Sequence, residues 1–385
     1  MRTQVAIIGA GPAGLLLAHL LRAGGVESVV IETRTREYVE SRIRAGILEH
    51  STVDLLRSAG LGDRLTREGD EHRGIHLQWP GERHHIDFQD LVGHGVWVYG
   101  QTEVQKDLGR ACDDAGQQVI YDVRDTAVHD PADPYVTFTV DGRPERVDAD
   151  VVVGCDGSFG PTRESVPGTT WQRTYAYSWL GVLANVPPST DELIYAWHPD
   201  GFALNSMRSP TVTRLYLQVP SDTDIAEWPD ERIWDALSDR LGHGQDGWRL
   251  ARGPITDKSV LPMRSFVQAP MRRERVFLAG DAAHIVPPTG AKGLNLAVAD
   301  VALLAPALAA LLRGKDTRLA DEYSDRALRR VWRCTHFSWW MTTMLHATED
   351  PFDQQLQLSQ LRWVASSAAG AQGLAENYAG LPIGF

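Results

Sequence analysis

The sequence predicts an α/β fold with α+β elements: a βαβ unit at the N-terminus, an inserted, mainly antiparallel β-sheet and a helical C-terminal region. Three observations support this fold class. A β-branched run near the N-terminus ends in glycines and leads into an apolar helical stretch. Between about Ala176 and Pro220, polar and apolar residues alternate between proline and glycine turns, which is typical of antiparallel hairpins. From Asn295 onward the pattern is helical and rich in Trp and Met.

The composition indicates a folded protein of two or three structural units. The chain has 385 residues, of which 43% are apolar and 23% charged. With 38 Lys and Arg against 50 Asp and Glu, the net charge of −12 disfavours nucleic acid and anionic membranes as partners. An anionic ligand therefore needs a local positive pocket.

The cysteines and the apolar runs predict the compartment. Cys112, Cys155 and Cys334 are odd in number and far apart in sequence, which favours a reducing cytoplasm and no metal centre. The longest apolar run, Val301 to Leu312, is interrupted by Pro306 and is expected to be a buried helix rather than a membrane span. Glycines break the apolar N-terminus within a few residues, so no signal peptide is expected. We expect a cytoplasmic protein.

The first elements in chain order form a βαβ unit. Gln4 to Ile8 and Ser28 to Ile31 are predicted to be buried strands, and Leu15 to Leu21 is apolar at nearly every position, as a buried helix requires. A strand, a glycine turn, a helix and a second parallel strand are the start of a Rossmann-like domain.

The glycine turn carries a dinucleotide-binding pattern. Gly9, Gly11 and Gly14 fit G-x-G-x-x-G directly after the strand, where they permit a tight turn and let backbone N–H groups reach a pyrophosphate. Glu32 lies 18 residues beyond the last glycine and is placed to accept hydrogen bonds from a ribose. The alternative is a merely tight loop. Because the sequence contains one such unit, a second dinucleotide must bind by another route.

Two later strands end in similar pairs of residues. Asp150 to Val153 leads to Asp156 between two glycines, and Arg275 to Leu278 leads to Gly280 and Asp281. We expect these strand ends to converge on one ligand. Asp281 can bond a ribityl hydroxyl or cap a helix, and the helix beginning near Gly293 can stabilise negative charge at its N-terminus.

The antiparallel region carries a candidate anion clamp. Along the predicted strand Phe202 to Arg208, alternation places Ser206 and Arg208 on one face. On the next strand Arg214 and Tyr216 likewise share a face. If the two faces coincide, a hydroxyl, a guanidinium and a phenol converge on a small anion, with Arg208 as the bidentate partner. The alternative is an ordinary solvated sheet face.

These motifs resemble a known family. The Gly9 to Gly14 fingerprint, Cys155-Asp156-Gly157 and Gly280-Asp281 are, in this order, similar to the three signatures of single-component aromatic hydroxylases of the flavoprotein monooxygenase group (group A). Further segments resemble the members that act on 4-hydroxybenzoate: Arg42 to Gly46, Tyr99 to Val104, Phe202 to Leu204, Arg264 to Phe266, Ala279 to Leu296, Phe337 to Met341 and Glu376 to Tyr378. The resemblance implies FAD, NADH or NADPH, and O₂. It also implies hydroxylation of 4-hydroxybenzoate to 3,4-dihydroxybenzoate by a flavin C4a-hydroperoxide that attacks the substrate phenolate.

The resemblance also implies roles for individual residues. Ser206, Arg208 and Tyr216 would bind the substrate carboxylate, and Tyr195 would hydrogen-bond the phenol oxygen. A free phenol ionises near pH ~10, so the site must favour the phenolate and give its proton a way out. The implied route runs through Tyr378 to His72, whose pKa near ~6.5 suits exchange with water. The Pro288 carbonyl would orient the phenol, with Thr289 nearby.

The implied cofactor contacts extend beyond the glycine turn and Glu32. Those to FAD are Arg42, Arg44, Gln101, Asp156, Arg214, Asp281 and Asn295, and those to the nicotinamide cofactor are Arg34, Tyr38, Arg42, Arg44 and Arg264. The flavin ring is expected to move between a closed position that excludes water and an open one that meets the nicotinamide.

Two departures from the family concern the choice of nicotinamide. Thr33 follows Glu32 where the NADPH-dependent members have a basic residue, and Phe159 stands in place of a histidine. A 2′-phosphate needs a nearby cationic donor, although Arg34 or Arg36 could compensate. We therefore expect NADH to be accepted.

The expected domains follow these motifs. Residues 1–72, 97–173 and 265–300 form the FAD-binding domain, 73–96 and 174–264 the substrate-binding domain, and 301–385 a helical region whose Trp and Met residues face either a homodimer partner or the core. Three alternatives remain open. They are hydroxylation of 4-aminobenzoate or 3,4-dihydroxybenzoate, a flavin dehydrogenase or oxidase, and a non-catalytic binding protein like the escort proteins of prenylated small GTPases.

Overall fold

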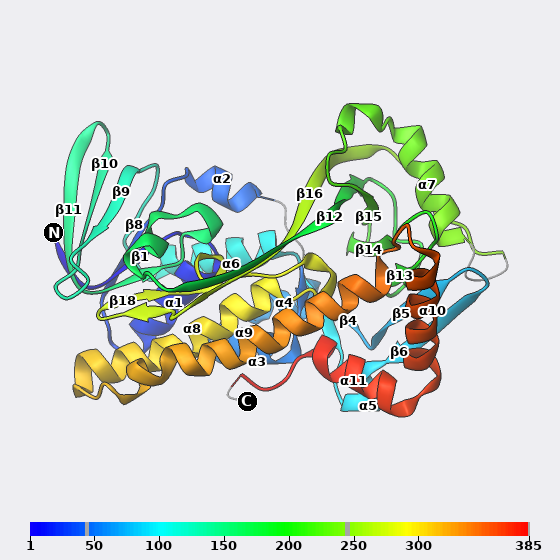
Figure 1. Ribbon diagram of the computed structural model, residues 1–385. Helices are drawn as coiled ribbons and strands as arrows, with labels where there is room; N and C mark the ends of the chain where they lie inside the picture. Colours follow the sequence, from blue (N-terminus) through cyan, green and yellow to red (C-terminus); the bar gives the residue numbers. More distant parts are fainter. Residues whose placement is uncertain (43–45, 243–246, 384–385) are drawn as a thin grey trace.

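The computed structural model describes residues 1–42, 46–242 and 247–383. Within these ranges the strands form two eight-stranded sheets and a three-stranded sheet, and the two large sheets lie side by side along the molecule (Figure 1). The three-stranded sheet is β3 (Ile47–Leu48), β7 (Val96–Val98) and β4 (Asp70–His72). The α/β fold class with an antiparallel sheet and a helical end is confirmed.

The first sheet contains the predicted βαβ unit. Its order is β17 (Arg272–Arg273), β18 (Val276–Leu278), β11 (Arg143–Gly154), β1 (Arg2–Ile8), β2 (Ser28–Ile31) and β8 (Val119–Ile120). The strands β9 (Arg124–His129) and β10 (Tyr135–Val140) extend β11 as an antiparallel meander that the sequence patterns did not reveal. The strands β1 and β2 are parallel, and α1 (Pro12–Ala23) connects them.

The predicted convergence of strand ends is confirmed by the register. Ile8 pairs with Gly154, and Gly154 pairs with Leu278, so β1, β11 and β18 end side by side. Each strand is followed at once by its glycine-containing turn, including the 3₁₀ turns η1 (Gly157–Phe159) and η4 (Gly280–Ala282). A second 3₁₀ turn, η2 (Pro161–Ser165), follows η1. Ligands of open parallel sheets bind at this carboxyl edge.

The second sheet is the predicted antiparallel one. Its order is β19 (His284–Ile285), β16 (Ile255–Ala269), β12 (Thr169–Ala184), β15 (Val212–Pro220), β14 (Ala203–Ser209), β13 (Ile194–Ala196), β5 (Gly74–Trp79) and β6 (Glu82–Asp87). One face packs against α7 (Asp230–Gly242), which follows the 3₁₀ turn η3 (Ile225–Glu227). The other face packs against the C-terminal helices.

The expected domain boundaries cross two long strands. Positions 173–174 and 264–265 lie inside β12 and β16, which pair from Thr169 to Ala184 with an irregularity between Thr174 and Ser178. A boundary drawn from the change in residue pattern cannot detect a strand that continues through it. The segment 73–96 does supply β5, β6 and α5 (Phe88–Val92), with β5 beside β13 as the division requires.

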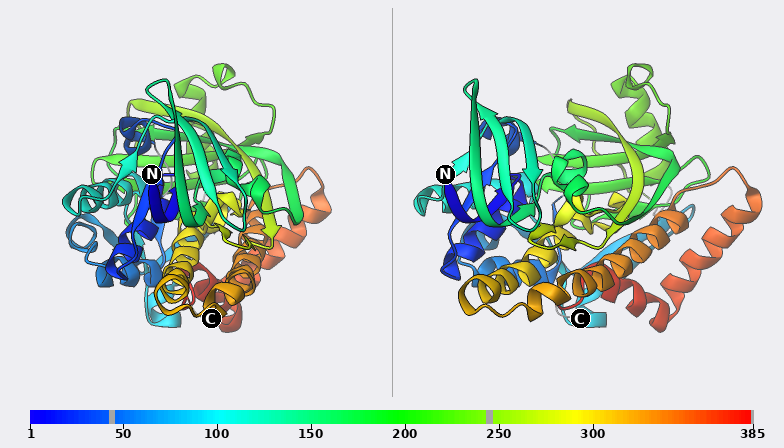
Figure 2. Two further views of the ribbon diagram at one scale, coloured as in Figure 1. Left: turned by 90° about the vertical axis from the view of Figure 1, so that its left-hand side faces the viewer. Right: turned by 60° about the vertical axis from the view of Figure 1, so that its left-hand side comes forward.

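Two long helices run beneath both sheets. Figure 2 shows α8 (Gly293–Ala309) and α9 (Arg318–Leu345) side by side along the molecule. The C-terminal α10 (Pro351–Ser366) and α11 (Ala368–Ala379) cover the second sheet. The remaining helices are α2 (Arg36–Ser41), α3 (His50–Ser58), α4 (Asp63–Glu68) and α6 (Gln101–Asp114) around the first sheet, together with the 3₁₀ turn η5 (Pro288–Gly290) ahead of α8.

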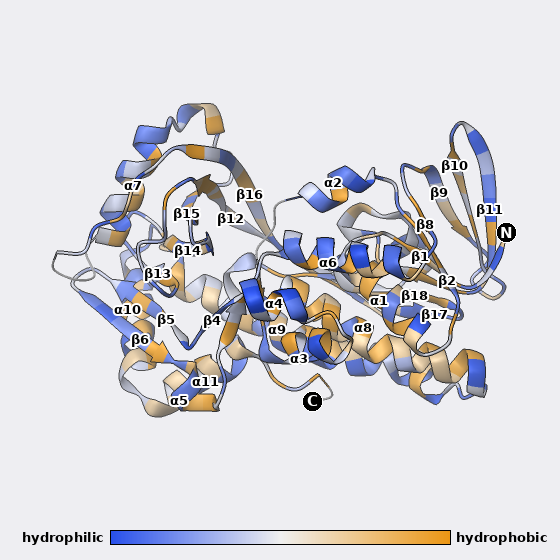
Figure 3. Cartoon of the chain, turned by 180° about the vertical axis from the view of Figure 1, so that it is seen from behind, coloured by the Kyte–Doolittle hydropathy of each residue, from blue (hydrophilic) through white to orange (hydrophobic). Residues whose placement is uncertain are grey.

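The expected buried helix in the apolar run Val301 to Leu312 is confirmed, and Pro306 lies within it. The helix α8 continues through Pro306 into the π-helical turn η6 (Ala310–Gly314), because one missing N–H leaves the rest of the helical hydrogen bonds intact. Gly293–Gly314 is long and apolar enough to cross a membrane, but 61% of its most apolar window is buried inside the protein. Figure 3 shows apolar residues along α8 and α1, which contact each other. A buried central helix passes the same length test.

Candidate active site

The glycine turn has the geometry of a nucleotide-binding loop. Gly9 has a φ of +105°, and an added Cβ would collide with the backbone of Cys155. A Cβ on Gly14 would collide with the carbonyl oxygen of Gly9. By contrast, a Cβ on Gly11 meets no atom of the described residues within 4 Å. Two glycines thus let the chain close on itself, and the third leaves open space at the N-terminus of α1.

Polar groups surround this open space. Glu32 is buried and accepts hydrogen bonds from the backbone N–H of Ala10 (2.7 Å) and of Arg34 (2.8 Å). Gln105, which sequence reasoning missed, donates to the carbonyl of Ala10 (2.8 Å), while its Oε1 lacks a partner within the described residues. Glu32 and Gln105 therefore hold the loop from opposite sides.

Asp156 extends the polar edge beyond β11. Its Oδ2 accepts from the N–H (2.9 Å) and the hydroxyl (2.7 Å) of Thr162, and its buried Oδ1 has no partner in the part of the chain that the structure describes. Burial raises the pKa of Asp156. The space at Gly11 and the N-terminus of α1 fit a phosphate group of a dinucleotide, and the free Oδ1 can accept a hydrogen bond from a hydroxyl or N–H of the same ligand.

The buried carboxylate of Asp300 on α8 fixes the turn after β18. The carboxylate of Asp300 accepts from the N–H of Gly280 (2.8 Å) and from Nε2 of His284 (2.6 Å). Burial opposes the charged form of His284, but Asp300 outweighs it and raises the His284 pKa. Asp281 lies on this turn, makes no side-chain hydrogen bond to any described residue and caps none of the helices found in them. Of its two expected roles, the ligand role stays a prediction.

The two predicted faces of the clamp coincide. Ser206 pairs directly with Arg214, and Leu204 with Tyr216, across β14 and β15. Since partners opposite each other share a face, Ser206, Arg214 and Tyr216 lie together. The ring of Tyr216 lies over Gly181 of β12, where a Cβ would be 2.9 Å from it. The absent side chain of Gly181 therefore sets the position of this phenol.

Arg208 reaches the same region by a different route. A register shift between Met207 and Ser209 takes it out of the regular ladder, so alternation alone does not fix its direction. Its Nη2 donates to Oγ1 of Thr102 on α6 (2.8 Å). Burial and the charge of Arg214 lower the Arg208 pKa, as expected for two neighbouring guanidinium groups.

Arg214 has unused donor capacity. Its Nε donates to the hydroxyl of Tyr216 (2.5 Å), and it is 6% exposed. Its buried Nη1 has no partner among residues 1–42, 46–242 and 247–383. A buried guanidinium with an unused N–H, beside a second arginine and a phenol, is a site for an anion.

A pair of tyrosines continues the same row of the sheet. Tyr195 on β13 pairs with Leu204, and Leu204 pairs with Tyr216. The phenols of Tyr195 and Tyr216 therefore lie on the same face of the sheet. The hydroxyls of Tyr195 and Tyr378 are 2.6 Å apart, and both side chains are 1% exposed. Burial raises the pKa of each well above the usual value, so both remain protonated.

His72 lies farther along the predicted proton route. It is buried on β4, where burial lowers its pKa, and its Nε2 is 3.2 Å from the exposed carboxylate of Asp70. Among the described residues, its Nδ1 has no partner and no hydrogen bond joins it to Tyr378. The structure therefore brings Tyr195 and Tyr378 together, and the step to His72 stays a prediction.

Comparison with known proteins identifies the family. A family model described as "FAD binding domain" matches residues 2–338. Over 389 aligned residues the chain is 48% identical to p-hydroxybenzoate hydroxylase of Acinetobacter baylyi, covering 99% of this chain and 96% of that protein. The chain belongs to the p-hydroxybenzoate hydroxylase family of FAD-binding proteins.

More distant relatives share the fold. A 3-(3-hydroxy-phenyl)propionate/3-hydroxycinnamic acid hydroxylase of Escherichia coli is 26% identical over 333 residues, which cover 84% of this chain and 58% of that protein. The solved structure of p-nitrophenol 4-monooxygenase from Pseudomonas putida superposes with a TM-score of 0.84 at 20% identity, covering 98% of this chain and 99% of that one. FAD is the cofactor of this family, and the open space at Gly11 fits it.

The residues expected at the nicotinamide of this hydroxylase family lie around α2. The guanidinium of Arg34 lies over the exposed ring of Tyr38, 5.2 Å from its centroid. Arg36 is bonded to Glu40 (2.7 Å) and to Asp113 (2.6 Å), so it does not compensate freely for Thr33.

Three further expected cofactor residues lie near the junction of the two large sheets. The guanidinium of Arg264 lies 5.2 Å from the ring centroid of Phe159, which is 90% exposed. Gln101 begins α6, and Arg42 ends α2, with its carbonyl 3.4 Å from the hydroxyl of Thr102. Arg44 lies outside the described residues. The contacts of these residues with the nicotinamide and the flavin stay predictions.

Some expected contacts are already used within the protein. The amide of Asn295 donates to the carbonyls of Ile47 (3.0 Å) and Ala291 (2.8 Å), and its oxygen accepts from Thr52 (2.8 Å). It therefore fixes α8 against α3, and its flavin contact stays a prediction. The Pro288 carbonyl accepts from the N–H of Ala291 (2.9 Å).

Sequence reasoning missed several supporting residues. Lys292 is buried at the start of α8 and donates to the carbonyl of Tyr378 (2.8 Å) and to Glu49 (2.7 Å). Glu49 also accepts from Arg330 (2.6 Å). The signal was available, because a lysine beside an apolar helix start has to find a buried partner. This network fixes α11 and therefore Tyr378.

A second group of residues that sequence reasoning missed connects Thr289 with Tyr216. Thr342 on α9 donates to the buried hydroxyl of Thr289 (2.9 Å), and its carbonyl accepts from Nδ1 of His346 (2.9 Å). Nε2 of His346 accepts from the indole of Trp179 (2.6 Å), whose ring lies 4.6 Å from that of Tyr216. Burial lowers the pKa of His346 to about 3, so this histidine is neutral.

Proposed function

We propose that this chain hydroxylates 4-hydroxybenzoate to 3,4-dihydroxybenzoate, with O₂ and NADH or NADPH as co-substrates. One observation carries the proposal. The second sheet carries an anion clamp at Ser206, Arg208, Arg214 and Tyr216, and Tyr195 lies in the same row as Tyr216, with its hydroxyl bonded to that of Tyr378 on α11. An aromatic acid with a hydroxyl opposite its carboxylate matches such an arrangement. The name of the relative that is 48% identical supports the same substrate.

The clamp binds the carboxylate and sets the orientation of the ring. Arg208 supplies the bidentate guanidinium and Tyr216 a hydroxyl donor. The hydroxyl of Ser206 donates to the carbonyl of Met207 (3.4 Å) and would rotate to donate to the carboxylate. The unused Nη1 of Arg214 adds positive potential at the same end. Because the donors stand at one end, the substrate hydroxyl is directed toward Tyr195.

The two tyrosines carry the phenol proton away. Both stay protonated because burial raises both pKa values. They therefore transfer a proton by donating in turn, each hydroxyl accepting one proton and passing on its own. His72, with its bond to the exposed Asp70, is the proposed exchange point with water. The Pro288 carbonyl and Thr289 are the proposed neighbours of the phenol.

FAD supplies the electron transfer and the oxygen activation when it is bound. Gly9, Gly11, Gly14, Glu32 and Asp156 would hold its nucleotide part. Asp281 would bind its ribityl chain, with Gln101, Arg42, Arg44, Arg214 and Asn295 as the further proposed flavin contacts. Exclusion of water from the bound flavin would protect the reaction from loss of reducing equivalents to peroxide.

NADH is the proposed preferred reductant, because Thr33 provides no charge and Arg36 is paired with Glu40 and Asp113. Arg34, Tyr38 and Arg264 are the proposed contacts, with Arg42 and Arg44. We also propose a cytoplasmic homodimer, as the three buried cysteines and the exposed aromatic residues of α9 and α10 suggest.

The test is a titration of the FAD-loaded protein with 4-hydroxybenzoate, followed by flavin absorbance. A spectral shift, and O₂ uptake with formation of 3,4-dihydroxybenzoate on NADH addition, are expected. 4-Aminobenzoate and 3,4-dihydroxybenzoate serve as competing substrates. A missing shift at millimolar 4-hydroxybenzoate, or faster turnover of either competitor, would overturn the proposal.

A further inference from the structure

We propose that Gly100 and Thr102, at the N-terminus of α6, orient the guanidinium of Arg208 and so determine the affinity for the substrate carboxylate. The inference rests on the proposed function. Neither residue belongs to the clamp face itself. Gly100 and Thr102 lie at the start of α6, which packs against α1 beside the first sheet.

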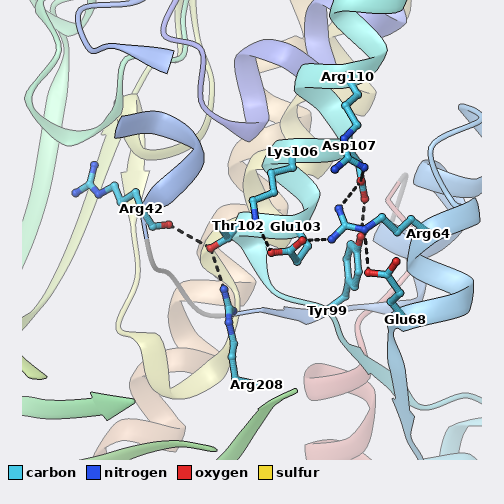
Figure 4. Close-up of polar contacts among 10 residues, drawn as sticks. All are labelled: Arg42, Arg64, Glu68, Tyr99, Thr102, Glu103, Lys106, Asp107, Arg110 and Arg208. Atoms are coloured by element: carbon cyan, nitrogen blue, oxygen red, sulfur yellow. Dashed lines mark hydrogen bonds and ion pairs between the residues drawn. The ribbon is translucent and has the colours of Figure 1, made fainter. Parts of the chain in front are cut away.

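The hydroxyl of Thr102 has a defined direction. Figure 4 shows it between Arg208 and the backbone of Arg42, whose guanidinium points away. Its single proton is donated to the carbonyl of Arg42 (3.4 Å), so its lone pairs face the Nη2 of Arg208 (2.8 Å). Thr102 thus acts as an acceptor at one corner of the guanidinium fork.

Gly100 provides the surface beneath the fork. A Cβ added here would lie 2.5 Å from Cζ, 2.6 Å from Nη1 and 2.7 Å from Nη2 of Arg208. The backbone of Gly100 has φ −53° and ψ 135°, which any residue adopts without strain. The glycine is therefore required by the arginine and not by the turn.

The platform that carries both residues is itself fixed. Arg64 of α4 is bonded to Glu103 and Asp107 of α6 and to Glu68, and the hydroxyl of Tyr99 donates to Asp107 (2.6 Å) (Figure 4). Such a network holds the first turn of α6 in one position. Thr102 can then hold Arg208 against the repulsion of Arg214.

This arrangement separates binding from chemistry. Gly100 and Thr102 contact Arg208, while the phenol end of the clamp face is lined by Tyr195 and Tyr378. A change at Gly100 or Thr102 should therefore alter affinity for the carboxylate and leave the hydroxylation step intact. They are positioning residues.

The experiment compares Thr102→Val, Thr102→Ser and Gly100→Ala in the FAD-loaded full chain. Thr343→Val is the matched control, since within the described part of the chain the hydroxyl of Thr343 bonds carbonyls of its own helix. Each variant is titrated, by flavin absorbance, with 4-hydroxybenzoate and with neutral 4-hydroxybenzamide.

For Thr102→Val we expect the Kd for 4-hydroxybenzoate to rise about tenfold, as a lost hydrogen bond to a charged group implies. The Kd for the amide should stay within about twofold, and kcat should be unchanged while KM rises. Thr102→Ser should behave as wild type. Gly100→Ala should show the same selective loss with a larger rise, because the whole fork is displaced.

Two outcomes overturn the inference: an unchanged Kd for 4-hydroxybenzoate in Thr102→Val, or an equal loss for acid and amide in both Thr102→Val and Gly100→Ala. A wild-type protein that binds neither ligand refutes the proposed function instead, and the inference with it.

Discussion

The glycine turn and the clamp face are built in opposite ways. The turn is made of consecutive residues whose lack of side chains lets backbone groups meet, as at Gly9 and Gly14. The clamp face and the phenol pair beside it are made of large side chains from separate strands and a helix, including Arg208, Tyr216 and Tyr378. The first depends on local backbone geometry, and the second on register and long-range packing. The two regions should therefore fail differently when changed.

The largest effect is expected in the turn. Gly14→Ala places a Cβ against the carbonyl oxygen of Gly9, where only the backbone can move. We expect a colourless protein, with FAD affinity reduced by about three orders of magnitude and stability reduced by about 3 kcal/mol. Thermal unfolding and FAD fluorescence measure the two quantities.

Gly11→Ala sharpens this result. Its Cβ meets no described protein atom, so the unfolding temperature of the apoprotein should stay unchanged while FAD affinity falls. If Gly11→Ala and Gly14→Ala lost the same amount of stability, the open space next to Gly11 would not be the binding site of a ligand.

The next effect tests the clamp face. Tyr195→Phe removes one hydroxyl of the buried pair and keeps the ring. Substrate binding should remain, product formation should fall by about 100-fold or more, and NADH oxidation should yield hydrogen peroxide. Product per NADH consumed is the measurement, and a fully coupled variant would remove Tyr195 from the proton route.

A third effect concerns His346, which is bonded to Trp179 next to Tyr216 of the clamp. The folded state holds His346 neutral with a pKa of about 3, whereas the unfolded chain takes up a proton below pH ~6.5. The unfolded state therefore binds more protons as pH falls, and stability decreases. Between pH 7 and pH 5 this histidine alone should remove about 2 kcal/mol.

Denaturant unfolding of wild type and His346→Asn at both pH values isolates this contribution. The variant should show a smaller loss of stability between pH 7 and pH 5. His284, with its raised pKa, has the opposite pH dependence and is present in both proteins, so it cancels in the comparison. Identical losses in the two proteins would contradict the assignment.

The smallest effect is expected for a change at Thr33, the residue that follows Glu32. Thr33→Arg adds a cation where a 2′-phosphate would lie, since Arg36 is paired elsewhere. We expect kcat/KM to shift about tenfold toward NADPH. A wild-type preference for NADPH of a hundredfold would already refute the proposed use of NADH.

The sequence was sufficient for the turn because its information is local. The spacing of Gly9, Gly11, Gly14 and Glu32 predicted a βαβ unit, and the unit is present with the expected strands. The hairpins were predicted from alternation and turn residues, and the faces of Ser206 and Tyr216 coincide as expected. Period-two patterns fix a face within each strand, and one correct pairing then fixes both.

The rest depended on contacts that no short pattern contains. Arg208 lies at a register shift, and its guanidinium contacts Thr102 and the backbone at Gly100, more than 100 positions away. Lys292 finds its partner Glu49 across 243 positions. Pairings of this kind follow from the packed fold and cannot be inferred from the period of a helix or strand.

The shared strands β12 and β16 have a practical consequence for the evolution and engineering of this chain. Cuts at positions 173–174 and 264–265 would sever the ladder between β12 and β16, so we expect an exchange of the proposed substrate-binding segment 174–264 between relatives to fail. Successful chimaeras should instead carry both long strands from one parent and vary only the hairpins between them. Proteins with new substrate ranges would then differ in those hairpins and share the two long strands β12 and β16.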